Sequence, residues 1–167
     1  MIAAFLQGAP VDACRLLSTE AIRQATGETV VNTKATSQTK GKLRQSQCFY
    51  TLPTFTNSIS LTVTSAAGLS HDGAREMWER LFHHGEEGEK ESGKDHKPES
   101  EEEEAAAKAE RVSGVGDEAY WVHSFVGNLY VRKGDRFLRI SLGGKMTDEE
   151  RQARAKSLAG SALRNLR

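Results

Sequence analysis

Short segments in which apolar and polar residues alternate constrain the fold of this chain more than any other feature. In "SISLTVTS", residues 58–65, Ile59, Leu61 and Val63 alternate with serines and threonines. In "RFLRISLG", residues 136–143, leucine and isoleucine alternate with arginine and serine. Since successive side chains of a strand point to opposite faces, this pattern is typical of a half-buried antiparallel strand. The chain is therefore expected to build a sheet with one apolar face.

Four further strands are predicted around these two. They are a polar, β-branched edge strand at 29–38, "CFYTL" at 48–52, "AYWVHSF" at 119–125 and "LYVRKG" at 129–134. The polar, basic stretch at 39–47 is predicted to be a loop. Hairpin turns are expected at Gly127-Asn128 and at Gly134-Asp135. Strands joined by such short connections favour antiparallel pairing.

Three amphipathic helices are predicted as well. The first lies within residues 12–27, where Ser18 or Thr19 can cap its main part. The second is "GAREMWERLFHH", for which Asp72 is the predicted cap. The third follows Thr147, which starts a capping-box pattern. The helices must cover the faces of the sheet, because each carries an apolar stripe.

The fold class that follows is α+β, an α/β/α sandwich around a central six-stranded antiparallel sheet. Its order is α-β-β-β-α-(acidic insert)-β-β-β-α, in one domain spanning 11–167. The insert, at about 86–110, contains no Ile, Leu, Val or aromatic residue. It therefore lacks the apolar surface that would offset the entropy of ordering, and is predicted to be disordered or loosely helical. Its eleven acids and four lysines make it strongly acidic, so the rest of the chain is mildly basic although the formal net charge is zero.

The N-terminus and the cysteines bear on the cellular compartment. Residues 1–10, "MIAAFLQGAP", resemble the end of an export signal, with a disordered N-terminus as the alternative. Two cysteines, Cys14 and Cys48, suggest a disulfide if the chain is exported and two buried thiols if it is cytosolic. Asp12 and Arg15 beside Cys14 are unlike the surroundings of a lipidated cysteine. The sequence has no transmembrane segment.

Several motifs occur in a recognisable order: "DACRLL", a polar helix ending in "ATG", "CFY", "VSGVGDEAYW", and "LYVRKGDRFLRISL" before the last helix. In this order they resemble a family of small exported bacterial proteins and lipoproteins of unknown function, over roughly residues 11–84 and 112–166. The resemblance implies a PsbP-like sandwich, a Cys14–Cys48 disulfide and a periplasmic or secreted location. It implies no catalytic residues.

The stretch "GVGDEAYW", residues 114–121, is the first candidate for chemistry. Asp117 and Glu118, with His123 nearby, could form an acid–base site. Neighbouring residues on a strand point to opposite faces, however, which favours a structural role. In that interpretation the glycines permit a tight turn, the aspartate bonds local backbone amides and the aromatic residues pack on the sheet. The predicted structural motif is Gly114, Gly116, Asp117, Tyr120 and Trp121.

The histidines and the basic residues are weaker candidates. His83 and His84 are about 100° apart on a helix, unlike an i, i+4 metal-binding pair. No serine or cysteine belongs to a recognisable nucleophile motif. The basic patch at Lys34, Lys40, Lys42 and Arg44 has no interleaved aromatic residues, so nucleic-acid binding is not expected. No cofactor and no metal are predicted.

The sequence thus predicts an exported, non-catalytic domain that binds or scaffolds in the cell envelope. Its partner would be an envelope protein, a small ligand or a surface polymer. The alternative is an envelope enzyme or a metal-handling protein that uses Asp117 with His123, or His83 with His84.

Overall fold

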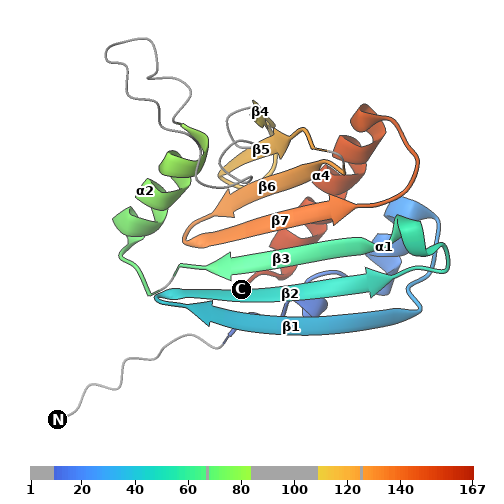
Figure 1. Cartoon of the computed structure of the whole chain (residues 1–167), viewed down its shortest axis with the longest axis horizontal. Coiled ribbons are helices and arrows are strands. Elements are labelled where there is room, and N and C mark those ends of the chain that lie inside the picture. Colours follow the sequence, from blue (N-terminus) through green and yellow to red (C-terminus); the bar gives the residue numbers. More distant parts are fainter. Residues whose placement is uncertain (1–9, 67, 84–108, 125) are drawn as a thin grey trace.

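The computed structural model describes residues 10–66, 68–83, 109–124 and 126–167. This part of the chain forms one antiparallel sheet with helices on both sides (Figure 1). The strands are β1 (Asn32–Lys40), β2 (Leu43–Thr51), β3 (Ile59–Ser65), β4 (Ala109–Arg111), β5 (Glu118–Val122), β6 (Asn128–Lys133) and β7 (Arg136–Leu142). The helices are α1 (Thr19–Thr26), α2 (His71–Phe82) and α4 (Asp148–Asn165), with short 3₁₀ turns η1 (Ala13–Arg15) and η2 (Phe55–Asn57).

The sheet consists of two meanders joined edge to edge, in the order β1-β2-β3-β7-β6-β5-β4. The joint is the central antiparallel pair β3–β7, where Leu61 lies opposite Ile140. Within each meander the strands follow one another in sequence, as short connections require. Helix α2 lies between the two meanders in the chain order.

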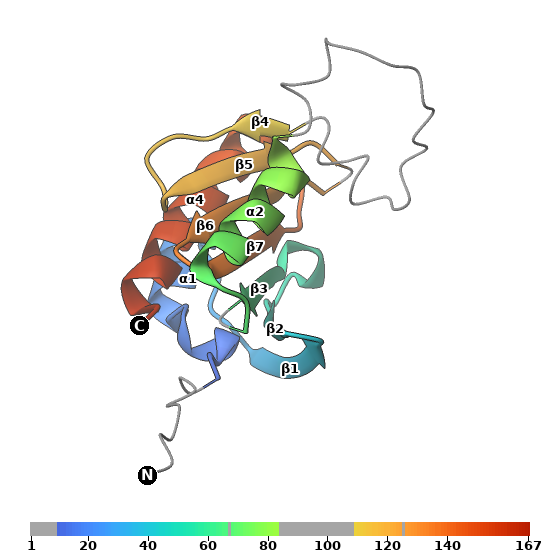
Figure 2. The same cartoon turned by 90° about the vertical axis from the view of Figure 1, so that its left-hand side faces the viewer.

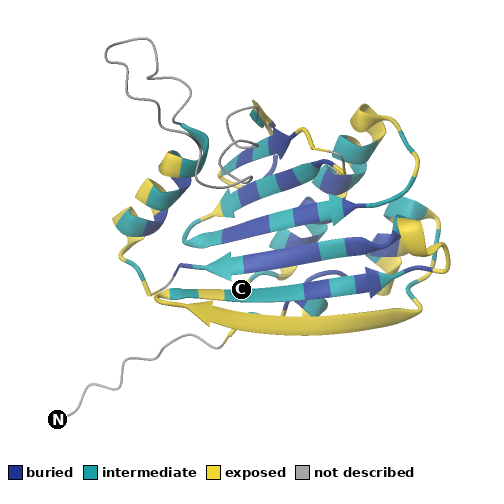
Figure 3. Ribbon diagram, viewed as in Figure 1, coloured by how far each residue is buried: buried dark blue, intermediate teal, exposed yellow. Residues whose placement is uncertain are grey.

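The helices divide between the two faces of the sheet (Figure 2). On one face α1 and α4 cover the large core, which includes Ile22, Leu61, Trp121, Ile140 and Leu158, all 0–1% exposed. On the other face α2 packs on the sheet and is the helix found there among the described residues, with a small cluster of Ala66, Ala74, Trp78 and Phe137. Burial follows this division, and β1 at the sheet edge is exposed along its whole length (Figure 3). The α+β class and the single antiparallel sheet are therefore confirmed.

The predicted six strands were too few, since the sheet has seven. The additional strand β4 pairs with β5, and Ala109 and Glu110 lie in it although they were assigned to the acidic insert. Residues 84–108, the rest of that predicted disordered segment, lie outside the described residues, as do residues 1–9. The predicted loop at 39–47 is also wrong. Most residues of this stretch belong to β1 or β2, and only the turn of the β1–β2 hairpin lies between them. Gly41 in that turn has a φ of 56°.

The helix ends agree with the capping patterns except in α2. Ser18 caps α1, and Thr147 with Glu150 forms the capping box of α4. Helix α2 begins earlier than predicted, because Ser70 rather than Asp72 is its cap: Ser70 Oγ accepts a hydrogen bond from the Gly73 amide at 3.1 Å. Each cap satisfies an amide that has no partner within its helix.

A disulfide joins Cys14 in η1 to Cys48 in β2, which confirms the predicted bridge. Two hydrogen bonds hold the same region: the Tyr50 hydroxyl donates to the Ala13 carbonyl at 2.9 Å, and the Ala13 amide donates to Ser46 Oγ at 3.0 Å. Burial raises the pKa of Tyr50 to about 12, so this phenol remains a donor. The η1 turn is thereby fastened to the sheet covalently and by hydrogen bonds.

None of the helices in the described part of the chain combines the length and the apolar character needed to span a bilayer.

Candidate functional site

The "GVGDEAYW" stretch enters β5 through a turn that requires glycine. Gly114 and Gly116 have φ values of 79° and 63°, a region that residues with a Cβ rarely adopt. A Cβ on Gly116 would lie 2.4 Å from Val131 Cγ1 and 2.7 Å from the Arg132 carbonyl oxygen. The close approach of this turn to β6 therefore depends on the absence of a side chain.

Asp117 holds the neighbouring β6–β7 turn. Its Oδ2 accepts a hydrogen bond from the Gly134 amide at 2.7 Å, and its Oδ1 accepts one from Lys133 Nζ at 3.1 Å. The Gly134 amide, followed by the Lys133 ammonium and the Arg132 charge, lowers the pKa of Asp117 below its ordinary value. All of these partners belong to β6 or to the turn after it. The carboxylate therefore joins the entry turn of β5 to the β6–β7 turn.

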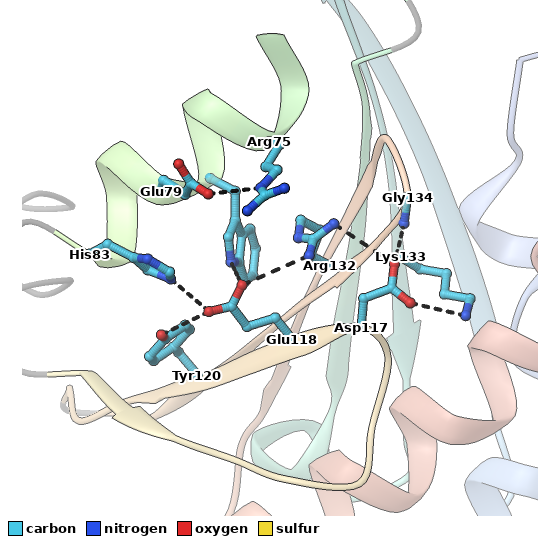
Figure 4. A network of polar contacts seen from close by, with 10 residues as sticks. Arg75, Glu79, His83, Asp117, Glu118, Tyr120, Arg132, Lys133 and Gly134 are labelled. Carbon is cyan, nitrogen blue, oxygen red and sulfur yellow. Dashed lines mark hydrogen bonds and ion pairs between the residues drawn. The ribbon is translucent and has the colours of Figure 1, made fainter. Parts of the chain in front are cut away.

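Glu118 points toward α2 and is the centre of a second polar network (Figure 4). Its side chain is only 11% exposed. Its carboxylate accepts hydrogen bonds from Trp78 Nε1 at 3.0 Å and from the Tyr120 hydroxyl at 2.9 Å, and its Oε1 lies 2.6 Å from His83 Nε2. Arg132 lies further off, at 3.9 Å. The network thus fastens the C-terminal half of α2 to β5.

Two opposing effects act on the pKa of Glu118. Burial, the largest single effect, raises it, whereas the hydrogen bonds from His83, Tyr120 and Trp78 and the charge of His83 lower it. Together the partners outweigh burial, and the pKa lies below its ordinary value. Glu118 is therefore held as a carboxylate.

His123 belongs to a third group, at the opposite end of β5 from Asp117. Its Nε2 lies 3.2 Å from Glu110 Oε2 and its Nδ1 lies 2.9 Å from Asp148 Oδ2, which also accepts a hydrogen bond from Trp121 Nε1. Asp117 and His123 are consequently not brought together. His84 lies outside the described residues, and among those described no group of three or more His, Cys, Asp or Glu side chains is placed to hold a metal ion.

Aromatic rings accompany the Glu118 network beneath α2. The Phe82 ring stacks on Tyr120 with centroids 4.7 Å apart, and Trp78 contacts Phe82 at 4.5 Å and Phe137 at 5.3 Å. Such tilted and stacked contacts stabilise beyond the burial of area alone. Of these rings, Trp78 and Phe82 on the helix and Phe137 on the sheet line an unfilled space between the two.

That space is a cleft of about 220 Å³. Helix α2 supplies one side and strands of both meanders supply the other. The lining is mostly aliphatic and aromatic, with a few polar side chains from the sheet: Leu43, Gln45, Thr62, Thr64, Met77, Trp78, Leu81, Phe82, Val122, Tyr130, Phe137, Leu138 and Arg139. A concave apolar space with a few polar groups is the usual character of a binding site for a small molecule.

The floor of the cleft contains a buried hydroxyl without a hydrogen-bond partner among the described residues. Three hydroxyl residues of β3 face α2, namely Ser60, Thr62 and Thr64. Ser60 accepts a hydrogen bond from the Gln47 amide at 2.9 Å, and Thr64 accepts one from the Gln45 amide at 3.4 Å. Thr62, between them, is 4% exposed, and its Oγ1 has no such partner.

In comparisons with known proteins, no family model, no curated protein and no solved structure matches the chain.

The cleft was not anticipated from the sequence. The alternation in β3 was interpreted correctly, with serines and threonines on the face opposite the apolar core, but which helix covers that face is decided by contacts distant in sequence. The apolar stripe of α2, including Trp78 and Phe82, was the available signal. Glu118 was singled out beside Asp117, yet its partners Trp78 and His83 lie 40 and 35 residues away in the chain.

Proposed function

We propose that this protein is an exported, non-catalytic domain of the cell envelope that binds a small apolar ligand, or the apolar end of a larger one, in the cleft beneath α2. The observation that carries the proposal is the cleft itself, about 220 Å³ between α2 and the sheet, with largely apolar walls. Since a water molecule takes about 30 Å³ of liquid, this is room for roughly seven to ten non-hydrogen atoms. A ligand of this size gains its affinity chiefly from removal of apolar surface from water.

The disulfide supports the export part of the proposal. Cys14–Cys48 links an N-terminal turn to an inner strand, and such bridges persist in oxidising compartments but are rare in the cytosol. A three-layer arrangement around an antiparallel sheet also supports the proposed relationship with the PsbP-like exported family. We therefore propose a periplasmic or secreted location.

The state of the carboxylates favours binding over acid–base catalysis. A general base that works near neutral pH needs a pKa raised toward the working pH and access to its substrate. Asp117 and Glu118 instead have lowered pKa values, and their oxygens are occupied by donors from the protein itself. Their geometry is that of groups that position a turn and a helix.

The two tryptophans provide a direct test. Trp78 lines the cleft, whereas Trp121 is buried in the core on the opposite face. In a ¹H–¹⁵N spectrum, titration with toluene should shift the indole signal of Trp78 in a saturable way and leave that of Trp121 unchanged. The signals are assigned with a Trp78→Phe variant.

The matched variants are Leu81→Trp and Arg80→Trp. Leu81 lines the cleft and is half-buried, so a larger ring there should occlude the space and abolish the shift. Arg80 is exposed on the same helix, so the same ring there should leave toluene binding unchanged. Absence of a saturable Trp78 shift in the wild type, or an equal shift in Leu81→Trp, would contradict the proposed function.

A further inference from the structure

We infer that the cleft selects an amphiphile, whose apolar body lies between α2 and the sheet and whose anionic hydrogen-bond acceptor, such as a carboxylate, meets the Thr62 hydroxyl. This inference rests on the proposed function and specifies the chemical class of its ligand. It is carried by the unpartnered hydroxyl on the floor of the cleft.

Thr62 stands out because its neighbours show how this face of β3 satisfies a hydroxyl. Gln47 and Gln45 of β2 reach across to Ser60 and Thr64, each with one side-chain amide. Thr62 lies between Ser60 and Thr64 on this face. Gln47 is the residue opposite Thr62 on β2, but its side-chain amide already donates to Ser60. A buried polar group without a partner is costly, and the great majority of such groups in proteins are satisfied.

The side chain of valine has the same shape as that of threonine without the hydroxyl. For the fold alone, valine at position 62 would therefore be the better residue, since β3 places this side chain under α2 in mostly apolar surroundings. A hydroxyl retained at a cost to stability, and located at the wall of a cleft, indicates that the partner of the hydroxyl is a ligand. The donor O–H then requires an acceptor on that ligand.

The charge around the cleft indicates which acceptor is favoured. Among the described residues that line the cleft, the charged one is Arg139, and none is a carboxylate. Arg139 lies opposite Thr62 on the neighbouring strand β7. A guanidinium nearby favours an anionic group and disfavours an ammonium group. The apolar walls exclude a ligand that is polar throughout. A short carboxylate with an alkyl chain satisfies all three requirements.

The experiment compares three probes on the full chain: octanoate, octylammonium and toluene, each titrated against the Trp78 indole signal with Trp121 as the internal reference. In the wild type, octanoate should bind at least tenfold more tightly than octylammonium. In Thr62→Val the affinity for octanoate should fall about tenfold or more, because a hydrogen bond to a charged acceptor is lost. Toluene, which has no hydrogen-bond acceptor for the hydroxyl, should not show this loss of affinity.

Two further variants serve as controls. Thr64→Val makes the same change at another residue of the cleft lining, where Gln45 already donates to the hydroxyl, and should lower octanoate affinity by less than Thr62→Val does. Thr62→Ser retains a hydroxyl and should keep most of the octanoate affinity that Thr62→Val loses. It also supplies a second readout should Thr62→Val fail to fold, because a loss of octanoate preference in a folded Thr62→Ser would count against the inference.

The outcomes separate the two proposals. If toluene shifts Trp78 while octanoate binds wild type and Thr62→Val equally, or no better than octylammonium, the ligand class is wrong and the cleft remains a binding site. If neither toluene nor octanoate produces a saturable Trp78 shift, the proposed function fails and the ligand class fails with it.

Discussion

Replacement of Glu118 by glutamine tests whether one buried carboxylate fastens α2 to the sheet. Glutamine has nearly the same shape but only one acceptor oxygen, whereas the carboxylate serves Trp78, Tyr120 and His83. The amide oxygen can accept from one of the two aromatic donors, so the other is left unpaired at a cost of about 1–3 kcal/mol. His83 is 38% exposed and can turn to water, so its loss adds less than about 1 kcal/mol. The free energy of unfolding should therefore fall by about 1–4 kcal/mol.

The assay is urea unfolding at pH 7, followed by far-UV circular dichroism, with Glu79→Gln as the matched control. Glu79 also lies on α2 and pairs with Arg75 at 2.9 Å, but both side chains are well exposed, at 41% and 66%. Removal of such a surface pair should cost less than about 0.5 kcal/mol. An unchanged slope of free energy against urea would show that both variants keep the native compactness. If Glu118→Gln and Glu79→Gln lose equally little stability, the Glu118 network does not fasten α2 to the sheet.

Three other predictions concern the disulfide, the entry turn of β5 and the dependence on pH. Cys48→Ser should lower the free energy of unfolding by about 3.5–4 kcal/mol, because the disulfide restricts the unfolded chain over a separation of 34 residues. A melting temperature equal to that of the oxidised wild type would contradict this. Gly116→Ala should lower the melting temperature more than Gly134→Ala does. Both glycines have a positive φ, but a Cβ at Gly116 would collide with Val131 and Arg132, whereas a Cβ at Gly134 meets nothing within 4 Å. Equal losses in the two variants would contradict this steric explanation. The pKa values of Asp117 and Glu118 are lowered in the folded protein, so both carboxylates stabilise it at a pH above their unfolded-state pKa values. This stabilisation should be lost as the pH falls through the folded-state pKa values. The decline in stability between pH 5 and pH 2 should therefore be shallower in Glu118→Gln than in the wild type.

The parts of the fold that the sequence predicts are those with a local physical signal. Strands β3 and β7 alternate because one face of each packs on the α4 side, and Gly134 marks the hairpin between β6 and β7 because its φ is 59°. Strand β1 lacks alternation and was predicted at 29–38 from its β-branched residues, two residues short of its end at Lys40. All of its residues are exposed, so no alternation marks its length, and it is held by backbone pairing with β2. The predicted loop at 39–47 failed at its first two residues for that reason. Its residues 43–47 belong to β2, where most side chains are half-buried, and apolar and polar residues do not alternate.

The candidate site depends on information that is not local. That Asp117 and Glu118 diverge follows from the geometry of a strand, and the structure directs one to the Gly134 turn and the other to α2. Nothing near Glu118 in the sequence identifies Trp78 as its partner. Nothing near Thr62 shows that Gln45 and Gln47 engage the hydroxyls on either side of it. These contacts arise when α2 and β2 are placed on the same face of the sheet.

The two faces of the sheet differ in how completely their buried polar groups are satisfied, and this difference favours the α2 face as the proposed binding surface. On the α4 face the buried polar atoms have partners: the Tyr50 hydroxyl bonds Ala13, and the Trp121 indole bonds Asp148. Among the described residues, the buried side-chain atoms without a partner are Thr62 Oγ1 and Arg132 Nε, and both residues lie on the α2 face. The larger of the two apolar clusters lies on the α4 face, so the α2 face contributes less of the buried apolar surface. Departures from local consistency concentrate where a protein meets its ligand, so the α2 face is the one on which binding should be sought.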